Sequence, residues 1–315
     1  MMTEIPCSRK IDLQERIQIR RIHIMSEQCT PSACSTCGSN CASRQAPNDF
    51  MAHLAKGSSV KHVYAVMSGK GGVGKSLVTS LLASAFSKKG NRVAVLDADV
   101  TGPSIPRAVA IDKNDLYLSE SGLMVPPVSR GGVHVLSSNL LLQHEDDPVL
   151  WRGSLIASAI KQFYSESLWD DIDYMFVDMP PGTGDVPLTV FQSLPVEGII
   201  MVTSPQDLVS MIVGKAVNMA RKMNIPVLGI VENMSYVVCP DCGRHINVFG
   251  ESHIEDVAAS YGLSVLAKLP IDPEISAAVD DGLVETLNTS CMDKAVAAIE
   301  AIDSFTKDCF KAPEE

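Results

Sequence analysis

The sequence predicts an α/β fold, a doubly wound and mostly parallel sheet with helices on both faces. From Lys61 onward, short apolar runs that are typical of buried strands alternate with longer segments of helical periodicity. A glycine-rich turn follows the first of these runs and opens a helix, as in the strand-loop-helix units of parallel sheets. With 315 residues, of which 46% are hydrophobic, the chain is long enough to bury one full core.

The elements expected from these patterns alternate along the chain. Strands are predicted at residues 63–67, 92–96, 133–137, 174–178, 198–203, 227–232 and 265–269. Helices are predicted at residues 75–89, 153–166, 186–194, 208–223, 253–260, 273–280 and 292–308. They form one domain over residues 60–315, preceded by an extension and a Cys-rich tail over residues 1–59. This tail has too few large apolar residues to build a core, so we expect it to be flexible and ordered only by a metal or a partner.

The turn after the first predicted strand fits the phosphate-binding pattern G-x-x-x-x-G-K-S/T from Gly69 to Ser76. Its glycines let backbone N–H groups turn inward around a phosphate, and the following helix directs its positive end at the same charge. We expect Lys75 to reach the β- and γ-phosphates and Ser76 to ligate Mg²⁺. The predicted nucleotide contacts are Gly69, Lys70, Gly71, Gly72, Val73, Gly74, Lys75, Ser76 and Leu77.

Polar residues follow three other predicted strands, at the edge of the sheet where ligands bind. Asp99 is the candidate that orients or deprotonates an attacking water, although an Asp at this position can also cap a helix, and Asp97 is a candidate structural acid. Asp178 is expected to hold Mg²⁺. The loop that follows it, residues 179–185, contains glycines that would let the loop act as a switch, although it can also be a static turn. The amide of Asn233 has the donor and acceptor needed to bind an adenine edge.

Six of the nine cysteines lie in two tight groups. The pair Cys239 and Cys242 has the spacing of a knuckle whose thiolates bind one metal centre. Two thiolates do not complete a four-cysteine site, but a symmetric dimer would supply four, two from each chain. Sequence chemistry leaves an iron-sulfur cluster, zinc and a redox pair open. An N-terminal group could bind a second metal, or deliver metal transiently; its members are Cys29, Cys34, Cys37 and Cys41.

The composition disfavours some classes of partner. The net charge of −11 and the pI near 5.1 are unlike those of a protein that binds a phosphate backbone. No apolar run approaches the length of a membrane span, and the predicted C-terminal helix has a mildly acidic polar face instead of a basic one. We therefore expect a cytoplasmic protein with no nucleic-acid or membrane partner.

Several motifs together resemble a known family. The loop with its second lysine, Lys70, and segments 97–106 and 178–185 resemble the deviant Walker ATPases that include MinD, ParA, ArsA and the nitrogenase iron protein. The segments Gly-Pro-Ser-Ile-Pro, Pro-Pro-Gly-Thr-Gly-Asp and Cys-Pro-Asp-Cys look specifically like the Mrp/ApbC branch. The resemblance implies slow ATP hydrolysis in a homodimer, with Lys70, Lys75 and Asp99 as catalytic residues and Lys70 reaching the partner's nucleotide. It also implies transfer of a [4Fe-4S] cluster from scaffold proteins to apo-proteins.

Three alternatives share this architecture. One is a MinD- or ParA-like positioning ATPase that cycles on a membrane or on DNA, and another is a zinc-stabilised ATPase without cluster transfer. The third is an electron donor in the manner of the nitrogenase iron protein. The acidic pI disfavours the first, whereas the cysteine spacing does not separate a carrier from an electron donor.

Overall fold

The structure is a computed structural model that describes Arg9–Lys10 and residues 51–99, 102, 104–141, 153–205 and 209–309. The predicted N-terminal metal site at Cys29, Cys34, Cys37 and Cys41 lies outside these residues. Among the described helices, none is both long and apolar enough to cross a membrane.

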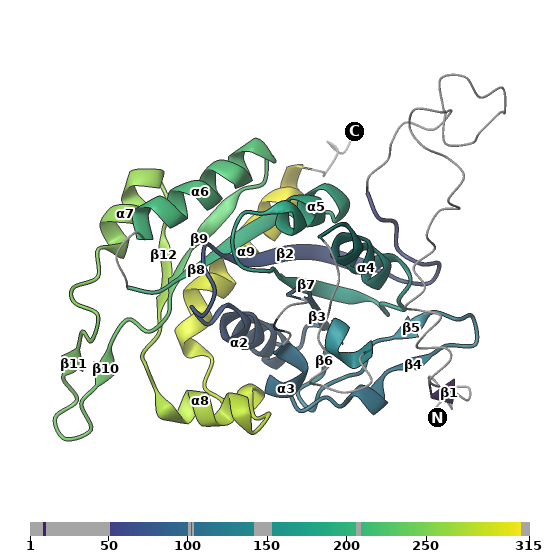
Figure 1. The fold of residues 1–315 in the computed structure, drawn as a ribbon, viewed down its shortest axis with the longest axis horizontal. Coiled ribbons are helices and arrows are strands. Elements are labelled where there is room, and N and C mark those ends of the chain that lie inside the picture. Colours follow the sequence, from purple (N-terminus) through teal and green to yellow (C-terminus); the bar gives the residue numbers. More distant parts are fainter. Residues whose placement is uncertain are drawn as a thin grey trace.

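A parallel sheet forms the centre of the molecule (Figure 1). Within the described chain it has seven strands in the order β12-β9-β8-β2-β7-β3-β6, and every pairing is parallel. The strands are β2 (Val60–Ser68), β3 (Val93–Asp97), β6 (Val133–Ser137), β7 (Ile172–Asp178), β8 (Gly198–Thr203), β9 (Val227–Glu232) and β12 (Val265–Lys268). They are nearly continuous apolar runs because the central strands are covered on both faces. This confirms the predicted fold class.

Helices cover the two faces of the sheet (Figure 1). The first face carries α2 (Lys75–Lys88), α3 (Ile105–Ala108), α8 (Pro273–Asp280) and α9 (Asp293–Cys309). The second carries α4 (Gly153–Ser165), α5 (Asp185–Ser193), α6 (Val209–Lys222) and α7 (Ile254–Tyr261). Helix α2 is central to the first face, and its Phe86 ring packs against Tyr174 and Phe176 of β7 with centroid distances of 4.4 and 5.4 Å. This packing fixes the C-terminal half of α2 against β7.

The predicted strands and helices lie within three residues of their observed ends. Short elements were missed, because two to four residues carry no periodicity. They are the hairpin β10 (Val237–Val238) and β11 (His245–Ile246), the antiparallel strands β1 (Arg9–Lys10), β4 (Tyr117–Leu118) and β5 (Met124–Val125), helix α3, and the 3₁₀ turns η3 (Lys113–Asp115), η4 (Ser138–Leu141), η5 (Val284–Thr286) and η6 (Ser290–Met292).

The end of the predicted tail, residues 51–59, contacts the folded body. Ala52 is buried, and its backbone N–H donates to the carbonyl of Ser193 at 2.7 Å. The N–H of Ser59 donates to the carbonyl of the buried Trp169 at 2.8 Å. These backbone contacts attach this part of the predicted tail to the folded body.

The strand order brings three chain segments together at one edge of the sheet. Strand β7 lies between β2 and β3, so that Asp178 is in register with Val66 on one side and with Asp97 on the other. The loop after β2 opens at the same edge. In open α/β sheets this is the edge at which ligands bind.

Candidate nucleotide site and cysteine hairpin

The predicted phosphate loop joins β2 to α2 in a left-handed turn. Gly72 and Gly74 have φ angles of 78° and 80°, which favour glycine because a Cβ is strained there. Gly74 is the N-cap of α2, and no side chain caps this helix end. The first N–H groups of α2 and the positive end of its dipole therefore face the loop, as phosphate binding requires.

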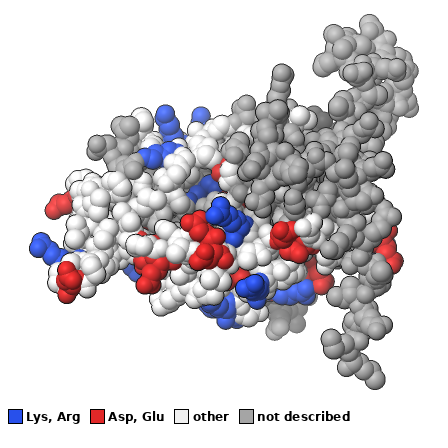
Figure 2. Space-filling view, turned by 60° about the horizontal axis from the view of Figure 1, so that its bottom comes forward, with Lys and Arg blue, Asp and Glu red and all other residues white. Residues whose placement is uncertain are grey.

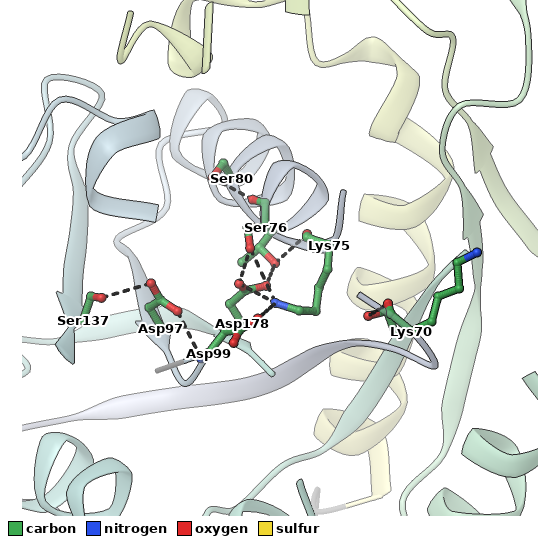
Figure 3. Close-up of polar contacts among 10 residues, drawn as sticks. Lys70, Lys75, Ser76, Ser80, Asp97, Asp99, Ser137 and Asp178 are labelled. Carbon is green, nitrogen blue, oxygen red and sulfur yellow. Dashed lines mark hydrogen bonds and ion pairs between the residues drawn. The ribbon is translucent and has the colours of Figure 1, made fainter. Parts of the chain in front are cut away.

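Asp178 is the hub of the polar contacts beside this loop (Figure 3). Its Oδ2 accepts hydrogen bonds from Lys75 Nζ at 2.7 Å and from Ser76 Oγ at 2.6 Å, and its Oδ1 accepts one from Thr79 Oγ1 at 2.6 Å. The carboxyl group is fully buried. The three donors come from the first turns of α2, so the carboxylate fixes the helix start against β7. A carboxylate oxygen and a hydroxyl side by side are the hard oxygen ligands that Mg²⁺ prefers.

The two aspartates at the carboxyl end of β3, Asp97 and Asp99, have different surroundings. Asp97 is fully buried, and its carboxyl oxygens accept hydrogen bonds from Ser137 Oγ at 3.0 Å and from the N–H of Asp99 at 3.2 Å. Burial, together with the negative charge of Asp178, raises the pKa of Asp97 well above its ordinary value. Asp99 Oδ2 lies 3.5 Å from Lys75 Nζ, so the structure brings this predicted catalytic residue to the phosphate loop.

Asn233, the residue after β9, packs against the phosphate loop. Its side chain is 3% exposed, its Nδ2 donates to the carbonyl of Val73 at 3.0 Å, and its backbone N–H donates to Thr203 at 2.8 Å. In this geometry the amide supports the loop, and recognition of an adenine edge by it remains a prediction.

The loop after β7 touches the phosphate loop. The N–H of Gly182, whose φ angle is 89°, donates to the carbonyl of Ser68 at 2.8 Å. The ring of Pro181 lies against Gly71, with 3.9 Å between its Cγ and the position of a Cβ on that glycine.

Lys70 is oriented differently from Lys75. Its side chain extends away from the cluster around Asp178 (Figure 3), and its carbonyl accepts a hydrogen bond from Ser68 Oγ at 2.9 Å. The Lys75 ammonium lies against the carboxylates of Asp178 and Asp99, so the two lysine side chains of the loop point in different directions (Figure 3).

Two polar residues of the cluster were not singled out from the sequence. Thr79 lies four residues after Lys75, so helical periodicity places it on the same face of α2, and this signal was available. Ser137 meets Asp97 because β6 pairs with β3 in register. That pairing depends on the strand order, which no local sequence pattern indicates.

Replacing Gly74 with alanine should destabilise the fold by about 1–3 kcal/mol and weaken nucleotide binding. The φ angle is unfavourable for alanine, and the added Cβ would collide with Asn233 Nδ2. Urea unfolding and nucleotide titration measure the two effects. Gly90→Ala is the matched control, since its φ angle is 89° but no atom lies within 4 Å of the added Cβ. Equal loss of nucleotide affinity in both variants would contradict the role of the Asn233 contact.

The second predicted site is a hairpin formed by β10 and β11 (Figure 1). Its turn is closed by backbone hydrogen bonds of 2.9 Å from Cys239 N–H to Arg244 and from Gly243 N–H to Cys239. Cys239 and Cys242 are free thiols, the first half-buried and the second exposed. Backbone N–H groups of Cys242 and then Asp241 donate to the Cys239 sulfur and lower the pKa of its thiol. The same N–H groups would stabilise a metal-bound thiolate.

This cysteine pair has too few neighbours to complete a metal site within the described chain, where no group of three or more His, Cys, Asp or Glu is arranged to hold a metal ion. The hairpin extends beyond the sheet (Figure 1). Four large apolar side chains around the pair are exposed: Val238, Ile246, Val248 and Phe249. Exposed apolar side chains beside unsatisfied ligands favour completion of the site by another molecule.

The pH dependence of alkylation should identify the activated thiol. Because the pKa of Cys239 is lowered, its thiolate is populated at lower pH than that of an ordinary cysteine. We expect the midpoint of its alkylation rate against pH to lie below that of a cysteine in an unstructured peptide. Iodoacetamide labelling with mass-spectrometric detection of the Cys239 peptide measures this midpoint. A midpoint at or above the peptide value would contradict the assigned hydrogen bonds.

The fold and the nucleotide site around the phosphate loop define the class of protein. A parallel sheet, a glycine-rich loop before a helix start, and an acid from a neighbouring strand beside the loop lysine are the features of a P-loop nucleotide-binding protein.

Comparison with known proteins identifies the family. Residues 59–304 match the family described as ParA: NUBPL iron-transfer P-loop NTPase, and the chain belongs to this family. It is 45% identical over 232 residues to an iron-sulfur cluster carrier protein of Clostridium perfringens, covering 72% of this chain and 81% of that protein. With the iron-sulfur cluster carrier protein of Methanocaldococcus jannaschii it shares 41% identity over 227 residues, covering 72% and 78% of the two chains.

Solved structures show the same fold. A nucleotide-binding protein from Archaeoglobus fulgidus, solved in complex with ADP, is 40% identical and superimposes with a TM-score of 0.64, covering 72% of this chain and 88% of the other. The cell division ATPase MinD of Pyrococcus furiosus superimposes with a TM-score of 0.52 at 20% identity, covering 76% and 99% of the two chains, and supports the fold alone. The predicted family and its P-loop NTPase fold are therefore confirmed.

Proposed function

We propose that this protein is an ATP-dependent carrier that binds a [4Fe-4S] cluster and transfers it to apo-proteins. The observation that carries the proposal is a pair of free thiols, one half-buried and one exposed, which is incomplete as a metal site among the described residues and lies on the same chain as a phosphate loop. The lowered pKa of Cys239 supports it, because the thiolate is the form that binds metal. In this account ATP hydrolysis changes how firmly the cluster is held.

The proposal assigns roles to the residues around the phosphate loop. Nucleotide phosphates bind the backbone of residues 69–77, with Lys75 beside the β- and γ-phosphates. Ser76 and Asp178, whose oxygens lie 2.6 Å apart, fit Mg²⁺ and would hold it directly or through water. Bound Mg²⁺ would neutralise charge that develops on the phosphates. Asp99 orients the attacking water, at the position where its carboxylate approaches Lys75.

The active form in this proposal is a homodimer. Two copies supply four thiolates from Cys239 and Cys242, which suits a cluster with four cysteine ligands. Lys70, whose side chain leaves its own cluster, would reach the nucleotide of the partner (Figure 3). Such a dimer would work in the cytoplasm, receive clusters from scaffold proteins, and deliver them to apo iron-sulfur proteins. Residues 1–59 would be an extension of the ATPase domain over residues 60–315.

Two alternatives use the same features. A Cys₄ site across a dimer would also hold zinc, and the protein would then be a zinc-stabilised ATPase without cargo. A positioning ATPase would need a surface for DNA or a membrane. Figure 2 shows basic and acidic side chains interspersed among the described residues of one face, an arrangement that favours the carrier over a DNA-binding protein.

Metal analysis of anaerobically reconstituted protein tests the proposal. We expect iron and sulfide in equal amounts at the hairpin, and their loss from that site in the Cys239→Ser, Cys242→Ser variant. Cys291→Ser is the control, because Cys291 is an exposed thiol outside the hairpin. Serine replacements of Cys29, Cys34, Cys37 and Cys41 remove any contribution of the N-terminal group. Zinc without sulfide would contradict the proposal, and sedimentation with liposomes or DNA only in the presence of ATP would favour a positioning ATPase.

A further inference from the structure

Glu232 connects both ends of the segment that carries the cysteine pair. This segment, residues 236–251, is called the cysteine arm below. Glu232 is the last residue of β9 and is 1% exposed. Its Oε2 accepts a hydrogen bond from Ser235 Oγ at 2.7 Å, and its Oε1 accepts one from Ser252 Oγ at 2.6 Å. One buried carboxylate therefore holds the residue before the arm and the residue after it.

The two ends of the arm are attached unequally. At the outgoing end, the N–H of Ser235 donates to the carbonyl of Leu269 at 2.8 Å, and the N–H of Ile271 donates to the carbonyl of Tyr236 at 2.7 Å. These backbone bonds to the segment after β12 hold this end in addition to the Ser235 hydroxyl. At the returning end, Ser252 links Glu232 to the start of α7, because its Oγ also accepts the N–H of Ile254 at 3.3 Å. Between these ends, residues 240–251 are exposed. The orientation of the arm therefore depends on its attachment points.

The residue after Glu232 is attached to the phosphate loop. Asn233 Nδ2 donates to the carbonyl of Val73, and the backbone of Gly74 lies so close to this amide that a Cβ there would collide with it. Met234 then turns the chain with a φ angle of 59°, which is unusual for a residue other than glycine. Glu232 and Asn233 are consecutive, so one peptide unit separates the residue that contacts the loop carbonyl from the carboxyl group that holds the arm.

We propose that Glu232 is a positioning residue that couples the nucleotide state of the phosphate loop to the position of Cys239 and Cys242. The coupling rests on the proposed function for its purpose, since it would let nucleotide binding alter the hold on a cluster. Its physical basis is the buried carboxyl group of Glu232, each of whose two oxygens accepts a hydroxyl hydrogen bond. Removing the Ser252 hydroxyl detaches the returning end of the arm from Glu232, whereas backbone hydrogen bonds still hold the outgoing end.

The reactivity of the two cysteines reports this coupling without any cluster. In the full-length apo-protein, alkylation rates of Cys239 and Cys242 are measured by mass spectrometry without nucleotide, with Mg-ADP, and with a non-hydrolysable Mg-ATP analogue. We expect nucleotide to change the wild-type rates by about fivefold or more, as is typical of coupled sites. In Ser252→Ala and Glu232→Gln the ratio should approach one, while the dissociation constants for nucleotide stay within about twofold of wild type.

Matched variants separate coupling from general damage. Ser252→Thr keeps the hydroxyl and should restore the wild-type ratio. Ser260→Ala, on α7, removes a hydroxyl that donates to Val257 at 2.7 Å, and Glu255→Gln changes an exposed acid of the same helix; both should behave as wild type. If Glu232→Gln does not fold, Ser252→Ala decides, because it removes a single hydroxyl from a half-buried residue.

Three results would overturn the inference. They are a wild-type protein whose alkylation rates do not respond to nucleotide, a Ser252→Ala variant that keeps the full response, and a loss of nucleotide affinity in Ser252→Ala. The carrier function fails separately. Suppose that the protein binds no iron or sulfide at Cys239 and Cys242, but that its alkylation response to nucleotide still needs Ser252. The coupling through Glu232 would then stand, and the proposal that the cysteine pair carries a cluster would be refuted.

Discussion

Replacing Asp178 with alanine should reduce ATP hydrolysis by about 100-fold or more and destabilise the fold by about 3–5 kcal/mol. The variant removes the acceptor of three hydrogen bonds, from Lys75, Ser76 and Thr79. It also leaves the Lys75 ammonium, whose side chain is 6% exposed, with Asp99 at 3.5 Å as its remaining ion-pair partner among the described residues. Phosphate release, Mg-ATP titration and urea unfolding measure the three consequences.

Asp173→Ala is the control for this substitution. Asp173 lies on the same strand, β7, and pairs with Lys61 at 2.7 Å, but its side chain is 26% exposed. A solvent-accessible pair of this kind contributes about 0–1 kcal/mol, so this variant should retain hydrolysis and most of the stability. The role given to Asp178 is wrong if the two variants lose hydrolysis equally, or if Asp178→Ala hydrolyses ATP at the wild-type rate.

Lys70→Ala should lower ATP hydrolysis by about 100-fold or more while nucleotide still binds. Lys75, Ser76 and Asp178 are untouched in this variant, and the Lys70 side chain points away from them (Figure 3). A cation supplied by the partner acts on the transferring phosphoryl group, so its loss affects hydrolysis more than binding. Turnover rates and equilibrium titrations with Mg-ATP separate the two effects.

Mixing two inactive variants tests whether Lys70 acts across a dimer. In a mixed dimer, the Lys70→Ala chain keeps its own Lys75 and Asp178, and the Asp178→Ala chain supplies the missing Lys70. One complete site is then formed, and hydrolysis should recover towards the activity of a single site. If mixed dimers form but show no recovery, Lys70 acts within its own chain and the proposed dimer loses a main argument.

The parts of the structure that could be predicted are those in which local chemistry determines the outcome. Strands buried on both faces appear as apolar runs, and the loop from Gly69 to Ser76 needs glycines and a lysine at fixed intervals. The contact of Ser137 with Asp97 could not be predicted, because it depends on β6 lying beside β3. Strand order is a property of the whole sheet, and no sequence pattern around either residue indicates it.

The cysteine hairpin illustrates the same limit. The interval between Cys239 and Cys242 predicts a knuckle, and the structure places the pair in a tight hairpin turn. The attachment of this hairpin to Glu232 could not be predicted, because Ser252 lies 20 residues away along the chain. Asn233 shows the converse case, since its amide suits base recognition by chemistry but is buried against Val73 in the fold.

Cluster transfer tests the carrier function most directly. Reconstituted protein is mixed anaerobically with an apo-enzyme whose activity requires a [4Fe-4S] cluster, in the presence of a chelator that removes free iron. We expect the wild-type protein to activate the acceptor and to lose its own cluster absorbance at the same rate. The Cys239→Ser, Cys242→Ser variant, with the N-terminal cysteines intact, should do neither. Activation of the acceptor by this variant at the wild-type rate and yield would contradict the account.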